Sequence, residues 1–171
     1  KDVLEIFNKV EKSVKSKLLI LGDGPDVEVI NEFINENPHL INKIKLLGKV
    51  DNLYQILKFA DVFLLPSEQE SFGLAALEAM AAGKPLIASD VSGVSDVVKN
   101  AGILFEKENA KELAVQVMKL INDPEYYLKI ATSCKERANK NIIENNETFA
   151  RSIKYILDKK ENEKIFWQSY I

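Results

Sequence analysis

Short runs of consecutive apolar residues alternate, along the first part of the chain, with segments in which apolar residues recur every three or four positions. A continuous apolar run is typical of a buried strand, whereas the wider spacing is typical of an amphipathic helix. The predicted strands cover residues 17–21, 44–47, 62–65, 85–88 and 102–105. The predicted helices between them cover residues 2–15, 25–34, 53–60 and 73–82. Strands that are apolar on both faces and alternate with helices form parallel sheets, so the pattern predicts a doubly wound α/β domain.

The periodicity after residue 105 is purely helical. Asn109 and Glu112 have the spacing of a capping box at the start of one helix. A second helix is expected from Pro124 to residue 139, and Asn145 can cap a third. The end of the chain is therefore predicted to add helices and no further strand.

The length of 171 residues suits a single domain of ordinary size. We expect one domain over residues 1–171, in which residues 1–105 form the alternating core and residues 106–171 form the C-terminal helices. The chain begins with Lys1 and carries no signal-peptide pattern, so we expect it to be a piece of a longer protein.

Composition and charge argue against several classes of protein. The chain has 23 Lys and Arg against 26 Asp and Glu, a formal net charge of -3 and a pI of about 5.4, whereas nucleic-acid-binding domains usually have a basic face. No apolar run approaches the ~18 residues of a membrane span. The single cysteine, Cys134, excludes an internal disulfide and a cysteine-based zinc site. We therefore expect no nucleic-acid partner and a cytoplasmic location, which is a reducing compartment.

The first candidate site is a glycine-rich turn. Ligands of doubly wound sheets bind at the carboxyl ends of the strands, where helices begin and present free N–H groups. The turn Gly22-Asp23-Gly24-Pro25 lies at such an end and resembles a phosphate-binding loop, although it lacks the later glycine of a dinucleotide fingerprint. A tight turn between a strand and a helix is the alternative interpretation.

The second candidate site is a helix with one charged residue. Glu78 is that residue, and every other side chain from Leu74 to Ala82 is apolar. A carboxylate on a buried helix is costly unless something hydrogen-bonds to it. The partner is either a ligand in the strand-end cleft, ~7 Å along the helix from Gly73, or a neighbouring backbone N–H or lysine.

A second carboxylate, Glu70, precedes the same helix. Acidic side chains near a helix N-terminus gain ~0.3–1 kcal/mol from the helix dipole, which is one explanation of its position. Gly73, however, leaves the backbone open to close approach by a phosphate. Two carboxylates beside such a helix start indicate a ligand that combines an anionic group with hydroxyl groups, and a nucleotide sugar fits that description.

The run from Glu70 to Pro85, Glu-Ser-Phe-Gly-Leu-Ala-Ala-Leu-Glu-Ala-Met-Ala-Ala-Gly-Lys-Pro, resembles the signature of retaining glycosyltransferases of family four, in which seven residues separate two glutamates. The blocks Leu-Leu-Ile-Leu-Gly-Asp-Gly-Pro (18–25) and Leu-Leu-Gly-Lys-Val (46–50) are similar to two other blocks of that family. The similarity covers essentially the whole chain. It implies the Rossmann-like, nucleotide-sugar-binding C-terminal half of the two-domain GT-B architecture.

The resemblance also implies roles for individual residues. Glu78 would accept hydrogen bonds from the ribose hydroxyls, and Glu70, the catalytic residue, would face the transferred sugar beside the reacting carbon. The backbone of Lys49 and Val50 would contact the edge of the base, commonly uracil, so a UDP-sugar is the expected donor. The sugar and diphosphate would be held by Ser71, Phe72, Gly73 and Leu74. Fixed positive groups would stabilise the departing diphosphate, so no metal ion and no cofactor are expected, and the anomeric configuration would be retained.

Some parts of the family's pattern lie outside this chain or differ in it. The resemblance places a phosphate-binding Arg and Lys upstream of Val3, at the end of a strand internal to the sheet. It also implies an N-terminal acceptor-binding domain, which we expect to be this chain's partner and which could associate with the inner face of a membrane. The 171-residue piece by itself is therefore expected to be inactive. Ser92-Gly-Val-Ser-Asp96 departs from the family's Gly-Gly-x-Pro-Glu, so no roles are transferred to it.

Two other functions remain open from the residues alone. Nucleotide-sugar epimerases share the GT-B architecture and bind the same ligand, although the paired glutamates disfavour them. A non-catalytic nucleotide-sugar-binding module would keep Glu78 and lose the sugar-facing chemistry, against which Glu70 counts. The acceptor and the sugar cannot be read from the sequence; cell-envelope polysaccharide assembly and low-molecular-weight thiol synthesis are both compatible settings.

Overall fold

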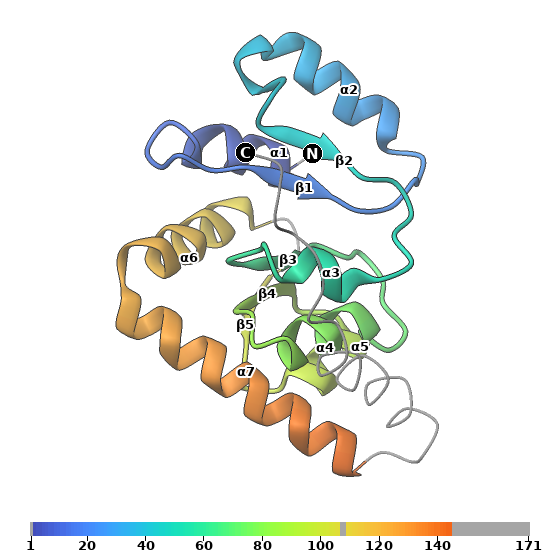
Figure 1. The fold of residues 1–171 in the computed structure, drawn as a ribbon, viewed down its shortest axis with the longest axis vertical. Helices are drawn as coiled ribbons and strands as arrows, with labels where there is room; N and C mark the ends of the chain where they lie inside the picture. The colour runs from blue at the N-terminus through green and yellow to red at the C-terminus, as the bar shows by residue number, and fades with distance from the viewer. Residues whose placement is uncertain (1, 107–108, 145–171) are drawn as a thin grey trace, which may run out of the picture.

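The computed structural model describes residues 2–106 and 109–144 (Figure 1). Helices and parallel strands alternate up to residue 105, so the predicted α/β class is confirmed. The strands are β1 (Leu18–Ile20), β2 (Ile44–Leu46), β3 (Phe63–Leu65), β4 (Leu86–Ser89) and β5 (Ile103–Phe105).

The helices in the described part of the chain are α1 (Asp2–Val10), α2 (Val27–Glu36), the short 3-10 helix η1 (Pro38–Leu40), α3 (Leu53–Leu57), α4 (Leu74–Ala81), α5 (Ser92–Val98), α6 (Ala110–Asn122) and α7 (Pro124–Glu144). No helix within residues 2–106 and 109–144 is both long enough and apolar enough to cross a membrane. The helix expected from Asn145 lies outside the described residues.

Several predicted helix boundaries differ from the structure: α2 covers Val27–Glu36 and not 25–34, and α3 ends at Leu57 and not at residue 60. The largest differences are at the ends of α1 and α7. α1 ends at Val10 and not at residue 15. Beyond it the chain forms turns, in which the N–H groups of Ser13 and Val14 both donate to the carbonyl oxygen of Val10, at 2.9 and 3.0 Å. α7 continues to Glu144, beyond the predicted end. The capping box at α6 is confirmed, because the Glu112 N–H donates to the Asn109 side chain at 3.1 Å.

α5 was not predicted from the sequence. Its residues, Ser-Gly-Val-Ser-Asp-Val-Val, are mostly poor helix formers. Val94, Val97 and Val98 are nevertheless buried, and their spacing of three and four positions is that of a helix face. Burial of this short apolar stripe against the sheet outweighs the low intrinsic helix propensity.

The five strands form two separate parallel sheets within the described residues, one with the order β1-β2 and one with the order β3-β4-β5. Leu18 pairs with Ile44 in the first sheet, and Phe63 pairs with Leu86 in the second. One edge of β1 and one edge of β3 therefore have no neighbouring strand in this part of the chain. The described strands therefore do not form one continuous sheet, because β1 and β3 do not pair with each other. We call the gap between β1 and β3 the break, and the candidate site lies along it.

Three apolar clusters hold these layers together. Residues of α4, α5 and α7 pack on one face of β4, and this cluster includes the buried Cys134. Ile6 and Val10 of α1 pack with α6 and with the other face of β4 and β5. Leu4 and Phe7 pack with β2, η1 and α2. Helix α1 thus contacts both sheets and bridges the break between them (Figure 1).

Candidate nucleotide-sugar site

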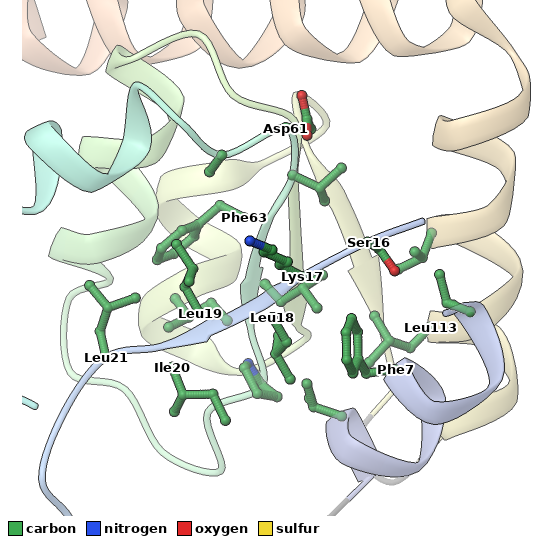
Figure 2. A pocket seen from close by; sticks show the side chains of 18 of the residues that line it. Phe7, Ser16, Lys17, Leu18, Leu19, Ile20, Leu21, Asp61, Phe63 and Leu113 are labelled. Atoms are coloured by element: carbon green, nitrogen blue, oxygen red, sulfur yellow. The ribbon is translucent and has the colours of Figure 1, made fainter. Parts of the chain in front are cut away.

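A large cavity opens along the break between the sheets. It has a volume of about 2340 Å³ and is lined by residues of both β1 and β3. Figure 2 shows Leu18 and Leu19 of β1, Phe63 of β3 and Phe7 of α1 around this space. Among the residues that line it at the carboxyl ends of the strands are Gly22, Lys49, Val50, Ser67, Glu78 and Ser89.

The loops after β1 and β2 are joined to each other. The N–H of Gly22 donates to the carbonyl oxygen of Gly48 at 2.7 Å, in an isolated antiparallel bridge. The ammonium of Lys49 lies 3.3 Å from a carboxylate oxygen of Asp23, and both side chains are largely exposed. The glycine-rich turn and the segment expected to contact the base therefore form one structural unit beside the cavity.

Glu78 lies in the second turn of α4, three residues after Ala75, and both residues line the cavity. Its side chain is half-buried between the apolar residues of the helix, and no ion pair or side-chain hydrogen bond to it is found among the described residues. Burial raises the pKa of the Glu78 carboxyl above its ordinary value, because the charged form loses hydration. Among the described residues, therefore, no lysine forms the ion pair with Glu78 that was one of the expected alternatives.

The loop before α4 is organised by its own acidic residue. The N–H of Phe72 donates to Oε1 of Glu70, at an N···O distance of 3.4 Å. Glu70 is half-buried, whereas the Phe72 and Leu74 side chains are exposed. Gly73 adopts the left-handed conformation (φ 69°) that lets the chain turn directly into α4.

The first turn of α5 supports this arrangement from the other side. A β-carbon on Gly93 would lie 2.2 Å from the carbonyl oxygen of Glu70, and a β-carbon on Gly73 would lie 3.2 Å from the carbonyl oxygen of Gly93. The loop before α4 and the first turn of α5 therefore touch backbone to backbone. Sequence reasoning gave Gly93 no role, because nothing local signals which backbone it will meet.

The structure divides the predicted site residues into two groups. Lys49, Val50 and Glu78 line one cavity, whereas residues 70–73 in the adjacent loop and Leu74 at the start of α4 do not line it. Ser89, a buried polar residue at the carboxyl end of β4, also lines the cavity and was missed. Its position as the last residue of an apolar strand was the available signal.

Among residues 2–106 and 109–144, no group of three His, Cys, Asp or Glu side chains is placed to hold a metal ion. This search of the described residues does not test whether the reaction needs a metal ion. The expectation that it needs none stays a prediction.

Comparison with known proteins identifies related sequences. The chain matches the family model of glycosyl transferases group 1 over residues 1–141. It is 37% identical over 137 residues to N-acetyl-alpha-D-glucosaminyl L-malate synthase of Bacillus anthracis, covering 79% of this chain and 36% of that protein. The chain spans about a third of the length of the curated relatives it matches.

Solved structures show the same architecture. HepE of Anabaena in complex with UDP-glucose has a TM-score of 0.69 and 25% identity, over 81% of this chain and 41% of that chain. The C-terminal domain of a glycosyl transferase group 1 family protein (LpcC) of Francisella tularensis has a TM-score of 0.70 and 23% identity, over 81% of this chain and 76% of that one. The latter likeness concerns the fold, and it agrees with the predicted C-terminal, Rossmann-like domain.

Proposed function

Because the chain belongs to the group 1 glycosyl transferases, we propose that it is the donor-binding half of a retaining glycosyltransferase that uses a nucleotide-diphosphate sugar. A UDP-sugar is the donor we favour. The observation that carries the proposal is Glu78: a half-buried carboxylate on an otherwise apolar helix, lining the strand-end cavity without a side-chain partner among the described residues. Two ribose hydroxyls would supply the hydrogen bonds that this carboxylate lacks.

The base would bind on the unit formed by the loops after β1 and β2. Lys49 and Val50 line the same cavity as Glu78, so a nucleoside with its ribose at Glu78 can direct its base toward them. The hydrogen bond from the Gly22 N–H to the Gly48 carbonyl oxygen supports this proposal, because it holds together the two loops that would contact the base. UDP-glucose in the HepE complex is a precedent in a protein of similar structure.

Glu70 would act on the reacting sugar. As the bond from the anomeric carbon to the diphosphate breaks, positive charge develops on the sugar and negative charge on the leaving group. A carboxylate beside the sugar can stabilise the positive charge. One oxygen of Glu70 accepts from the Phe72 N–H. A carboxylate has about four acceptor positions, so this bond orients Glu70 and leaves capacity for sugar hydroxyls.

The remaining elements would come from the N-terminal half of the full-length enzyme. The acceptor site and the cationic groups that stabilise the departing diphosphate belong there in this proposal, without a metal ion. Loss of a single positioned electrostatic group can already cost ~10²–10³ in rate. We therefore expect the 171-residue chain to bind UDP weakly and to transfer no sugar.

Calorimetric titration of UDP into the 171-residue chain tests the assignment of the ribose site. Glu78→Gln should weaken UDP binding tenfold or more, because a charged hydrogen-bonding partner contributes ~1.5–3 kcal/mol. Glu136→Gln, on the exposed surface of α7, makes the same chemical change away from the cavity and should leave the affinity unchanged. Equal affinities for wild type and Glu78→Gln would refute the ribose role, and equal affinities for UDP and ADP would refute the preference for uracil.

Product analysis with the full-length enzyme separates transfer from the other two functions. Incubation with a UDP-sugar and an acceptor should release UDP and form a glycoside with the donor's anomeric configuration. An epimerised sugar, or binding without any turnover, would instead identify an epimerase or a non-catalytic module.

A further inference from the structure

The first turn of α5 is closed by a side-chain hydrogen bond. The hydroxyl of Ser95 lies within hydrogen-bond reach of two acceptors, the carboxylate oxygen Oδ1 of Asp90 and the carbonyl oxygen of Val91, the latter at 3.0 Å. A hydroxyl has a single hydrogen to donate, and a charged acceptor forms the stronger bond. The Ser95 hydroxyl therefore donates mainly to Asp90. This bond spans the first turn of the helix, in which Gly93 lies.

Little else in the local sequence fixes this turn. α5 consists mostly of poor helix formers, and its N-cap residue, Val91, has no side-chain oxygen to accept from an N–H. The backbone supplies two bonds, from the N–H groups of Val94 and Ser95 to the Val91 carbonyl oxygen, both at 2.9 Å. Asp90 is itself held in place, because its N–H donates to the carbonyl oxygen of Phe105 at 2.8 Å. The bond to Asp90 thus ties the turn to the carboxyl end of the sheet.

The loop before α4, residues 66–73, depends on this turn for its position, and we call it the Glu70 loop. Residues 69–71 of this loop form no backbone–backbone hydrogen bond with the described parts of the chain. The carbonyl group of Glu70 and the peptide group between Ser71 and Phe72 lie directly against Gly93. A shift of the turn toward the loop would therefore displace Glu70, and a shift away from the loop would leave Glu70 without support.

We propose that Ser95 and Asp90 are positioning residues for Glu70. Their hydrogen bond sets the orientation of the first turn of α5, and the backbone of Gly93 transmits that orientation to the Glu70 loop. The proposal rests on the role in sugar transfer proposed above for Glu70. Ser95 stands where the family's pattern has proline, so this chain fixes the turn through a bond that proline cannot form.

Steady-state kinetics of the full-length enzyme test the proposal. Ser95→Ala removes the hydroxyl and should lower kcat about tenfold, which is less than the roughly hundredfold cost of a ~1 Å error in a catalytic group. The KM for the donor and the calorimetric affinity for UDP should change by less than about twofold, because an interaction needed only in the transition state changes turnover more than affinity.

Two single variants serve as references for Ser95→Ala. Ser95→Thr keeps the hydroxyl and should restore most of the lost turnover. Ser92→Ala makes the same chemical change at an exposed serine of the same helix, whose hydroxyl has no partner among the described residues, and should leave turnover unchanged.

Double variants follow the path of the effect. Asp90→Ala should lower kcat as much as Ser95→Ala does, and the double variant should be no slower than either, because both changes remove the same bond. In a Gly93→Ala background, Ser95→Ala should cost little further turnover, because the Glu70 loop is already displaced there.

The amide NMR signals of Ser71 and Phe72 in the ¹⁵N-labelled full-length enzyme give a readout that needs no substrate. Ser95→Ala should shift these signals, whereas Ser92→Ala should not. This measurement tests the coupling between the turn and the Glu70 loop even if the wild-type enzyme transfers no sugar, a result that would count against the proposed function.

Several results would overturn the proposal. One is unchanged turnover, or unchanged Ser71 and Phe72 signals, in Ser95→Ala. Another is a set of additive losses in Ser95→Ala and Asp90→Ala, which would mean that Asp90 acts on the substrate directly. A third is a loss of UDP affinity in Ser95→Ala that matches its loss of turnover, which would indicate general damage to the fold.

Discussion

The carbonyl oxygen of Glu70 approaches Gly93 so closely that a β-carbon on residue 93 would lie only 2.2 Å from it. The same β-carbon would be 2.6 Å from the carbonyl carbon of Ser71 and 2.8 Å from the amide nitrogen of Phe72. All three neighbours are backbone atoms, so no flexible side chain can move aside. The first turn of α5 therefore determines where Glu70 and the Phe72 amide lie relative to α4.

Gly93→Ala should displace the Glu70 loop and slow sugar transfer by the full-length enzyme about a hundredfold, because an error of ~1 Å in a catalytic group costs that order of rate. UDP affinity should fall less, since Glu78 lies on a different element. The measurements are steady-state turnover and UDP calorimetry. Thr132→Ala, at an exposed position of α7 that does not line the cavity, is the control and should leave turnover and UDP affinity unchanged. Unchanged turnover in Gly93→Ala would show that the loop can move without consequence.

Glu70→Gln should slow transfer by the full-length enzyme about a hundredfold and leave UDP binding nearly intact. The reason is that Glu70 is proposed to act where charge develops during bond cleavage, and an interaction made only in the transition state changes turnover more than affinity. Glu78→Gln is the comparison, with the larger effect expected on UDP affinity. Equal losses of UDP affinity in the two variants would disprove this division of roles.

Glu78→Gln should stabilise the unliganded chain at neutral pH while weakening UDP binding. Burial raises the pKa of Glu78 above its ordinary value of 4.5, so the folded state binds its proton more tightly than the unfolded state does. The contribution of this carboxyl to stability is therefore fully present below pH 4.5 and is lost as the pH rises through the folded pKa. Thermal melts should show a gain for Glu78→Gln at pH 7 and little gain at pH 4. The same gain at both pH values would contradict this linkage.

Cys134 should be unreactive in the folded chain. Burial raises its thiol pKa from 9.0 to about 11, and its sulfur lies 3.4 Å from the carbonyl oxygen of Ala101. At pH 8 the thiolate fraction is then ~100-fold below that of an exposed thiol, and access is blocked as well. Alkylation by iodoacetamide, followed by mass spectrometry, should label Cys134 only after denaturation. Rapid labelling of the native chain would show that the α4, α5 and α7 cluster opens readily.

The sequence by itself was sufficient for features that depend on neighbouring residues. Five apolar runs became five parallel strands, and the Asn109–Glu112 spacing became a helix cap with the expected bond. Glu78 was identified as unusual because its helix is otherwise apolar, and its half-buried position in α4 agrees with that reasoning. Periodicity and capping are local properties, so the order of residues determines them before any tertiary contact forms.

Tertiary structure decided the features that join distant segments. α5 forms although its residues favour other conformations, because its valines are buried against elements that no local pattern names. Gly93 and Glu70 are 23 positions apart, and their contact exists only because β4 lies beside β3. The break between β1 and β3 likewise appears only when strands are paired, since each strand has a sequence suited to the interior. Pairing and close backbone contact depend on which segments meet in space, and that information is distributed over the whole chain.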